Sequence, residues 1–387
     1  MKKKIAILGS TGSIGKTLLN IISKDKSNFE IILLTAKKSY KSLLSQANIF
    51  KVKNLIITDV KSYQKALSAT KYKKINIFNN FDHFNKIFKK KLDYTMSSII
   101  GLDGLLPTIR IIKYTKNIAI ANKEAIICGW DLINKQLKKN KTNFLPVDSE
   151  HFSIWKIIKF NTLKNIDKIF ITASGGPFLD KTHQKIKDAK ITDALNHPNW
   201  KMGKKISIDS ATMMNKVFEV IETRNIFDTP YKKIFILIHP SSYIHAIVKF
   251  NDGTSHLVAH DTSMKIPIFN TLYNKQNKEI KTTDLNIKKL NNLNFRNIDK
   301  TKFPIINILK LIPQNTSLYE TILVTSNDEF VNLFLKNKIK FHEISKNLLK
   351  FIKLKEFQKF RYISPKNIHD IQELSDYVRL KINSLSI

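Results

Sequence analysis

The residues best suited to chemistry gather in one stretch, SIDSATMMNKVFEVIE, residues 207–222. Its opening residues favour helix N-caps, and we expect Ser210 or a neighbour to cap a helix whose free N–H groups can seat an anion such as phosphate. Asn215, Lys216 and Glu219 follow at spacings of three and four, so their polar ends project from one helical surface. Taken alone, the segment also fits the commoner alternative, a capped amphipathic helix with a solvated polar side.

A second group of acidic residues lies in PVDSEHF, residues 146–152, after a short apolar run. Asp148 and Glu150 are two apart, and in an extended segment residues i and i+2 point the same way. Two carboxylates on one side suit a hard cation such as Mg²⁺ or Mn²⁺. A solvated turn is the commoner explanation of such a pair, because acidic residues are mostly exposed.

The N-terminus combines a strand, a glycine loop and a helix. The apolar run Lys4–Leu8 leads into GSTGSIG, with glycines at 9, 12 and 15, and a helical pattern follows. Small residues let the backbone approach a pyrophosphate, and the helix N-terminus supplies N–H groups and positive potential. The pattern predicts a dinucleotide site, with a tight turn that binds nothing as the alternative.

The next predicted strand, Glu30–Thr35, ends in Ala36, Lys37, Lys38 and a serine. NAD-specific proteins carry an acidic residue here for the ribose hydroxyls, whereas cations suit a 2′-phosphate. The sequence therefore favours NADP over NAD.

Further apolar runs alternate with helical stretches, which is typical of a doubly wound α/β sheet. These runs are Leu55–Thr58, Ile75–Phe78, Met96–Ile100, Ile118–Ala121 and Phe144–Val147. Two loops follow strand ends, where such folds meet their ligands: GLDGLLPT at 101–108, and ANKEAI at 121–126, which holds Asn122, Lys123 and Glu124.

Two later loops carry polar and aromatic residues. In FITASGGPF, Ser174 and two glycines offer a hydroxyl and exposed N–H groups, an anion-binding arrangement that also fits a plain strand-ending turn. In HPNWKMGKK, His197, Trp200 and Met202 indicate a lid that closes over a ligand. Packing of Trp200 against the loop beneath it is the structural alternative.

The chain of 387 residues carries a formal net charge of +35, which invites a nucleic-acid interpretation. The basic residues are nearly all lysines scattered along the chain, arginine is scarce, and no nucleic-acid motif accompanies them. We therefore expect no specific nucleic acid partner. No apolar run reaches the roughly 18 residues of a membrane span. A single cysteine, Cys128, excludes a disulfide framework, and a cytoplasmic location is the default expectation.

The pattern in the second half of the sequence predicts a sheet followed by helices. IHAIVKF and SHLVAHD are joined by Asp252-Gly253, a hairpin signal. The four histidines of this region, His239, His245, His256 and His260, are expected to be sheet residues and not a metal cluster. Residues 275–297 are polar and asparagine-rich and suggest a linker, and the pattern beyond them is helical.

Together these motifs resemble the 1-deoxy-D-xylulose 5-phosphate reductoisomerase family across essentially the whole chain. The resemblance is densest in GSTGSIG, ANKEAI, PVDSEHF, SGGPF, IHPSSYIHAIV and, above all, HPNWKMGKKISIDSATMMNK. It implies an NADPH- and metal-dependent rearrangement and reduction of 1-deoxy-D-xylulose 5-phosphate to 2-C-methyl-D-erythritol 4-phosphate, in non-mevalonate isoprenoid precursor biosynthesis. A homodimer is implied by the family alone.

The resemblance also implies roles for individual residues. It places Mg²⁺, Mn²⁺ or Co²⁺ on Asp148, Glu150 and Glu219, and groups Lys123 and His197 with these three as the catalytic set. Its substrate positions are Ser149, Ser174, His197, Trp200, Ser210, Asn215 and Lys216. Its NADPH positions are Gly9, Thr11, Gly12, Ser13, Ile14, Ala36, Lys37, Lys38, Asn122, Glu124, Met202 and Gly203.

The expected organisation has three domains. A Rossmann-like NADPH-binding domain spans 1–147, and an α+β catalytic domain spans 148–274, with a flexible flap at 197–207 and a dimerisation sheet. The linker covers 275–297 and a C-terminal helical bundle covers 298–387. Some positions depart from the family pattern, among them Ala36, Ala173 and Ser241, but no proposed metal ligand is lost. A non-catalytic dinucleotide-binding descendant of the enzyme is the alternative.

Overall fold

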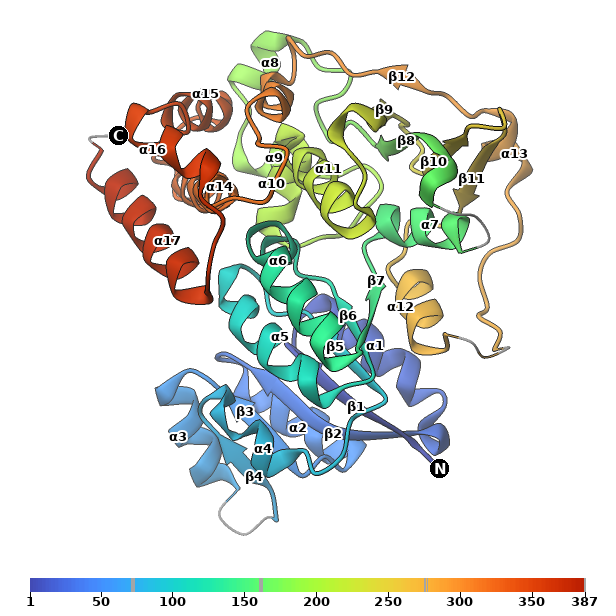
Figure 1. The fold of residues 1–387 in the computed structure, drawn as a ribbon, viewed down its shortest axis with the longest axis vertical. Coiled ribbons are helices and arrows are strands. Elements are labelled where there is room, and N and C mark those ends of the chain that lie inside the picture. Colours follow the sequence, from blue (N-terminus) through green and yellow to red (C-terminus); the bar gives the residue numbers. More distant parts are fainter. Residues whose placement is uncertain (71–73, 160–162, 275, 277, 386–387) are drawn as a thin grey trace. The chain divides into compact units, whose positions relative to one another are not determined.

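The computed structural model describes residues 1–70, 74–159, 163–274, 276 and 278–385. Residues 275 and 277 of the predicted linker, and residues 386 and 387 of the predicted C-terminal domain, therefore lie outside the description. The chain divides into two compact units (Figure 1). The first comprises residues 1–125, 131–148 and 264–280, and the second 126–130, 149–263 and 281–387.

The first unit is built on a parallel sheet. Among its described residues the strands are β1 Lys3–Leu8, β2 Phe29–Ala36, β3 Asn54–Ile57, β4 Asn76–Phe78, β5 Tyr94–Ser97, β6 Asn117–Ile120 and β7 Asn143–Pro146. Their order is β4-β3-β2-β1-β5-β6-β7, so the chain winds outward from β1 in both directions. This confirms the doubly wound prediction and puts the change of winding beside β1, where such sheets bind ligands.

Helices connect these strands. They are α1 Ser13–Ser23, α2 Tyr40–Phe50, α3 Val60–Ala69, α4 Phe84–Ile87, α5 Leu105–Ile111, α6 Lys123–Asn140 and, from later in the chain, α12 Lys265–Leu272. The helix α12 packs against α1, and Thr271 in α12 hydrogen-bonds the buried hydroxyl of Tyr94 at 3.0 Å. The central strand β1 is fully buried from Ile5 to Leu8, as expected of a parallel strand covered on both faces.

The second unit has a smaller mixed sheet of order β11-β10-β8-β9-β12. Its strands are β8 Ile166–Ala173, β9 Ile234–Ile238, β10 Ile244–Phe250, β11 Ser255–Ala259 and β12 Arg296–Asn297. The helices α7 Ser149–Ile158 and α11 Met214–Phe227 pack against it. Alternate residues such as Ile169 and Val248 face that helical layer in one apolar cluster.

The remaining helices of this unit are α8 His183–Lys187, α9 Ile191–Leu195, α10 Lys204–Thr212, α13 Ile287–Asn291, α14 Tyr319–Leu335, α15 Phe341–Phe351, α16 Lys355–Gln358 and α17 Ile368–Asn383. The last four form the predicted helical cluster, in which α14 packs on both α15 and α17 (Figure 1). The hairpin is confirmed, since β10 and β11 pair antiparallel around residues 251–254. None of the helices in the described part is long and apolar enough to cross a membrane.

A buried acid near the start of α14 makes stability depend on pH. Glu320 is 2% exposed and accepts hydrogen bonds from the backbone N–H and Oγ of Ser317, at 3.1 and 2.6 Å. Burial raises the pKa of Glu320 from 4.5 to about 7, against the opposing effect of these hydrogen bonds. The folded state therefore holds this proton more tightly than the unfolded chain, and stability is lost as pH rises from about 4.5 through about 7.

We expect Glu320→Gln to remove this loss, because the amide keeps the acceptor without the charge. The variant should be more stable than the parent at pH 8, by up to about 3 kcal/mol, and similar to it at pH 4.5. Urea unfolding across this pH range measures the effect. Glu329→Gln in the same helix, whose carboxylate pairs with Arg379 at 3.6 Å, is the control and should leave the slope unchanged. Parallel stability curves for Glu320→Gln and the parent would contradict the assignment.

Candidate active site

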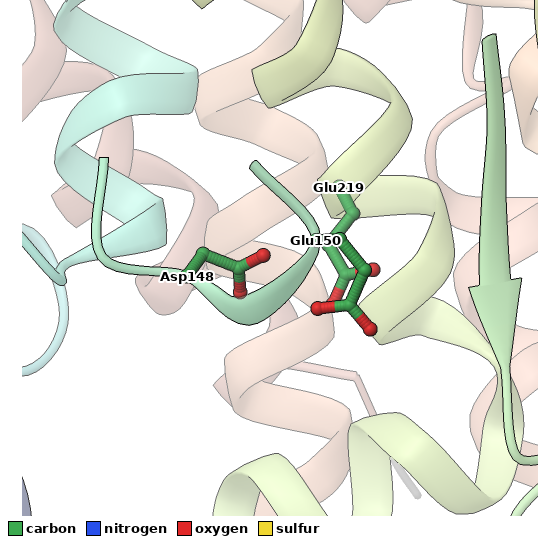
Figure 2. A group of neighbouring side chains, drawn as sticks. All are labelled: Asp148, Glu150 and Glu219. Atoms are coloured by element: carbon green, nitrogen blue, oxygen red, sulfur yellow. The ribbon is translucent and has the colours of Figure 1, made fainter. Parts of the chain in front are cut away.

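Three carboxylates converge at the N-terminus of α7 and on α11 (Figure 2). Asp148, Glu150 and Glu219 each offer an oxygen, and the three oxygens lie within 4.8 Å of one another. The expectation of an extended segment here is wrong: α7 begins at Ser149, so Glu150 lies in its first turn. The helical turn and the buried side chain of Glu219 bring the oxygens together instead.

Two lysines form ion pairs with this acidic cluster and offset part of its charge. Lys123 Nζ lies 2.5 Å from Asp148 Oδ2, and Lys216 Nζ lies 2.7 Å from Glu150 Oε1 and also pairs with Glu219. Burial alone would lower the pKa of the Lys216 ammonium, but the two carboxylates outweigh it and raise that pKa. Lys216 is therefore charged at neutral pH.

The chemistry-bearing stretch 207–222 is two helices and not one. The helix α10 ends at Thr212, Met213 adopts a left-handed conformation with φ of 69°, and α11 begins at Met214. Ser210 lies inside α10 and caps no helix, but its neighbour Thr212 accepts from the backbone N–H of Met214, the first residue of α11, at 3.3 Å. The predicted shared surface is present: Asn215 Nδ2 donates to Glu219 Oε1 at 2.5 Å.

The glycine loop after β8 lies against α10. Gly176 has φ of 66°, and a Cβ there would meet the backbone oxygen of Ser210 at 2.9 Å, so a larger residue does not fit. Within the loop the backbone N–H of Gly176 donates to Ser174 Oγ at 3.1 Å. This close approach puts the loop that carries Ser174 beside the helix that carries Ser210, and both serines are predicted phosphate ligands.

His197 connects this loop to the start of the predicted flap. Its Nδ1 accepts from the backbone N–H groups of Asn199 and Trp200 at 3.1 and 3.0 Å. The proton of the neutral ring is therefore on Nε2, which donates to Ser174 Oγ at 3.0 Å. Burial and, secondarily, the charge of Lys216 lower the pKa of His197 to about 4. The ring is therefore neutral at pH 7.

The rest of the flap runs from Trp200 to the start of α10. The Trp200 ring meets His245 edge-on at 6.1 Å between centroids, and His245 stacks on His260 at 3.7 Å. Met202 is partly exposed, and Gly203 is the N-cap of α10. Of the four histidines expected in the sheet, His245 lies in β10 and His256 in β11, whereas His239 and His260 directly follow the ends of β9 and β11.

Two glycines of the loop after β1 lie too close to neighbouring backbone to accept a side chain. A Cβ on Gly9 would meet Ser98 O at 2.8 Å, and a Cβ on Gly15 would meet Ser10 Cα at 2.5 Å. The next predicted cofactor residues, Thr11, Gly12, Ser13 and Ile14, lie at the start of α1, with Gly12 as its N-cap. Free N–H groups of that first turn can bind an anionic group.

The other predicted cofactor residues lie after β2 and β6. Ala36 ends β2, and Lys37 and Lys38 follow it with exposed side chains. Asn122 caps α6 by accepting from Ala125 N at 2.8 Å, so Lys123 and Glu124 fall in the first turn of that helix.

The structure also contains polar contacts that the sequence analysis missed. Lys205 Nζ lies 3.1 Å from Asp209 and 2.9 Å from Asp328, and Asn327 Nδ2 donates to Asp209 at 2.8 Å. These contacts tie α10, which follows the flap, to α14. The i,i+4 spacing of Lys205 and Asp209 was a visible signal, whereas their α14 partners are more than a hundred residues away.

A dinucleotide-type sheet and a three-carboxylate cation site in one chain define a metal-dependent nicotinamide oxidoreductase. Sequence models of 1-deoxy-D-xylulose 5-phosphate reductoisomerase match residues 5–129, and models of its C-terminal domains match residues 144–227 and 261–381. The chain belongs to the 1-deoxy-D-xylulose 5-phosphate reductoisomerase family.

Individual relatives agree with this placement. The chain is 57% identical to the Pelagibacter ubique 1-deoxy-D-xylulose 5-phosphate reductoisomerase over 387 residues, all of both chains. The Zymomonas mobilis enzyme in complex with NADPH matches with a TM-score of 0.88 at 30% identity, over 100% of both chains. A reductoisomerase in complex with NADPH, fosmidomycin and magnesium matches with a TM-score of 0.91 at 30% identity, over 99% of this chain and 98% of the other.

Proposed function

We propose that this protein catalyses the NADPH- and divalent-metal-dependent rearrangement and reduction of 1-deoxy-D-xylulose 5-phosphate to 2-C-methyl-D-erythritol 4-phosphate, a step toward isoprenoid precursors. The observation that carries the proposal is the convergence of Asp148, Glu150 and Glu219 in a chain of this family. The alternative, a descendant that kept the nucleotide fold and lost its chemistry, is disfavoured because these carboxylates and both neighbouring lysines are retained.

The three carboxylates fit a hard divalent cation by their oxygen chemistry and mutual distance. Mg²⁺, Mn²⁺ and Co²⁺ are the candidate ions. When bound, such a cation supplies positive charge that acidifies a substrate hydroxyl and polarises its carbonyl. We assign Lys123, which pairs with Asp148, to the reacting end of the substrate.

The phosphate of the substrate is assigned to Ser174, Ser210, Asn215 and Lys216, with Ser149 and His197 lining the remainder. Neutral His197 holds the Ser174 hydroxyl through a hydrogen bond from Nε2. Gly176 has no side chain, so the loop that contains Ser174 can lie against α10. Trp200 and Met202 form the flap that excludes water from the reactive intermediate.

For the cofactor, we assign the pyrophosphate to the loop from Gly9 to Ile14 and the 2′-phosphate to Lys37 and Lys38, with Ala36 beside them. NADPH supplies the hydride of the reduction. Asn122 and Glu124, at the start of α6, are assigned to its nicotinamide half together with Met202 and Gly203 of the flap. We propose the same division of roles along the chain: cofactor binding in 1–147, catalysis in 148–274, a linker at 275–297 and a helical domain at 298–387. Within the catalytic range, α12 packs in the first unit. A cytoplasmic location completes the proposal, in keeping with the single cysteine.

The outer face of the second sheet supports a homodimer. Phe170 and Phe235 lie side by side on the face opposite α7 and α11, with ring centroids 5.4 Å apart, and Phe235 is 39% exposed. At the edge of the sheet Leu257 in β11 is 49% exposed. Exposed apolar side chains on one sheet face suit burial against a second copy of the chain.

We expect the protein to sediment at twice the chain mass of 44.8 kDa, and Phe235→Asp to shift it toward the monomer, because the substitution replaces an apolar ring of the proposed interface with a charge that must lose its water. Analytical ultracentrifugation over a range of concentrations measures the change. Leu380→Asp, at an exposed leucine of α17, is the control and should leave the dimer intact. A monomeric parent protein would overturn the dimer and leave the enzyme assignment standing.

The activity is tested by NADPH oxidation with 1-deoxy-D-xylulose 5-phosphate, first with Mg²⁺ and then with excess EDTA. Turnover that requires both substrate and metal is the expected result. Folded protein that binds NADPH but never turns over would rule out the enzyme and favour the non-catalytic alternative.

A further inference from the structure

An ion pair links two strand ends on either side of β1. Lys37 follows β2 and Asp103 follows β5, in the turn Leu102–Gly104, and their Nζ and Oδ2 atoms are 2.7 Å apart. In the sheet, β2 and β5 are the two neighbours of β1. The pair therefore spans the carboxyl end of β1, where the glycine loop lies and where doubly wound sheets bind dinucleotides.

The turn that carries Asp103 is fixed by the fold. Asn122 Nδ2 donates to Gly101 O at 2.7 Å and also to Ile99 O, and Gly101 has φ of 74°, which favours glycine. Ser98 N donates to Leu8 O at 2.9 Å at the base of the turn. The backbone of this turn is thus anchored to β1 and α6, which keeps Asp103 at the carboxyl end of β1.

Both charged groups remain accessible to a ligand. The side chains of Lys37 and Asp103 are 67% and 63% exposed. Lys37 is the residue assigned above to the cofactor 2′-phosphate, and the same ammonium is already held by a carboxylate. A phosphate dianion that binds Lys37 must share the ammonium with that carboxylate or displace it, and in either case the two anions repel each other, because the anchored turn keeps Asp103 nearby.

We propose that Asp103 is a specificity-determining residue whose carboxylate competes with the 2′-phosphate of NADPH for Lys37 and so reduces the preference for NADPH over NADH. This inference rests on the proposed role of Lys37. NADH lacks the 2′-phosphate, so the competition affects one cofactor only. Exposed ion pairs are worth little in water, so the expected effect is a factor of about two to five in affinity.

The test measures dissociation constants of NADPH, NADH and 2′,5′-ADP for the full-length protein by calorimetry. Asp103→Asn is expected to increase the affinity for NADPH and 2′,5′-ADP about two- to fivefold and to leave the affinity for NADH unchanged. The gain should be absent in a Lys37→Met background and should shrink at about 0.5 M salt, where exposed charges are screened. Asp82→Asn, which removes the exposed partner of Arg110 in the same unit, controls for net charge and should change none of the three.

The outcomes separate this inference from the assignment beneath it. If Lys37→Met lowers the affinity for NADPH while Asp103→Asn leaves that affinity unchanged or lowers it too, the competition is overturned and the role of Lys37 stands. If Lys37→Met leaves NADPH unaffected, both the role of Lys37 and the competition fail, although turnover can still establish the enzyme.

Discussion

Glu219→Gln is expected to lower turnover at least about a hundredfold while the protein stays folded, because the substitution removes one of three converging carboxylates and keeps the shape of the side chain. Glu219 is 1% exposed, and the amide oxygen can still accept from Asn215. Lys216 retains Glu150 as a partner at 2.7 Å, so no charge is left buried alone. The cation site keeps two carboxylates and binds a divalent ion more weakly.

Two measurements separate the metal effect from a general defect. A Mg²⁺ titration of turnover should move to higher concentrations in Glu219→Gln, whereas NADPH affinity should stay at the parent value. Asp228→Asn is the matched control: this exposed acid ends the same helix in a left-handed conformation with φ of 48°, which asparagine tolerates. Parent-like turnover by a folded Glu219→Gln protein would show that Glu219 is not a metal ligand.

The elements that could be predicted from the sequence are those whose structure is determined by a local pattern. The first strand, the glycine loop and α1 follow from an apolar run and from glycines whose Cβ positions are blocked, as at Gly15. The other strands of the first sheet lie within a few residues of their predicted positions, because fully buried parallel strands are short apolar runs.

The failures occurred where packing overrides local preference. Met213 is buried and left-handed, a conformation that a non-glycine residue adopts only when its surroundings impose it. The break between α10 and α11 at this residue therefore could not be predicted from the local sequence. The pattern around Asp148 and Glu150 fitted a strand as well as a helix, and only the start of α7 decided it.

Contacts between residues far apart in the sequence also could not be predicted. The contact between Lys216 and Glu150 joins residues 66 apart, and the contact between Lys37 and Asp103 also joins residues 66 apart. The loop containing Asp103 was recognised as a ligand-facing strand end, and Asp103 is its one charged residue. That charge was the signal available, but its partner could be identified only once β2 and β5 were known to flank β1.

Lys216→Met is expected to destabilise the metal-free protein by about 3 kcal/mol, because it leaves two buried carboxylates without their shared cation. The Lys216 side chain is 9% exposed and lies between Glu150 and Glu219, whose mutual repulsion it offsets. A divalent cation on the same carboxylates can replace the missing charge. Mg²⁺ should therefore stabilise the variant more than it stabilises the parent. The variant should nevertheless be inactive, because Lys216 is also assigned to the substrate phosphate.

Urea unfolding in EDTA and in saturating Mg²⁺ gives this difference directly. Lys232→Met, at an exposed lysine of the same unit, is the control and should unfold like the parent in both conditions. Equal Mg²⁺ stabilisation of Lys216→Met and the parent would mean that the ion does not bind these carboxylates. A larger gain in Lys216→Met would show that lysine and metal share one acidic site, and that the lysine keeps the site folded until the metal binds.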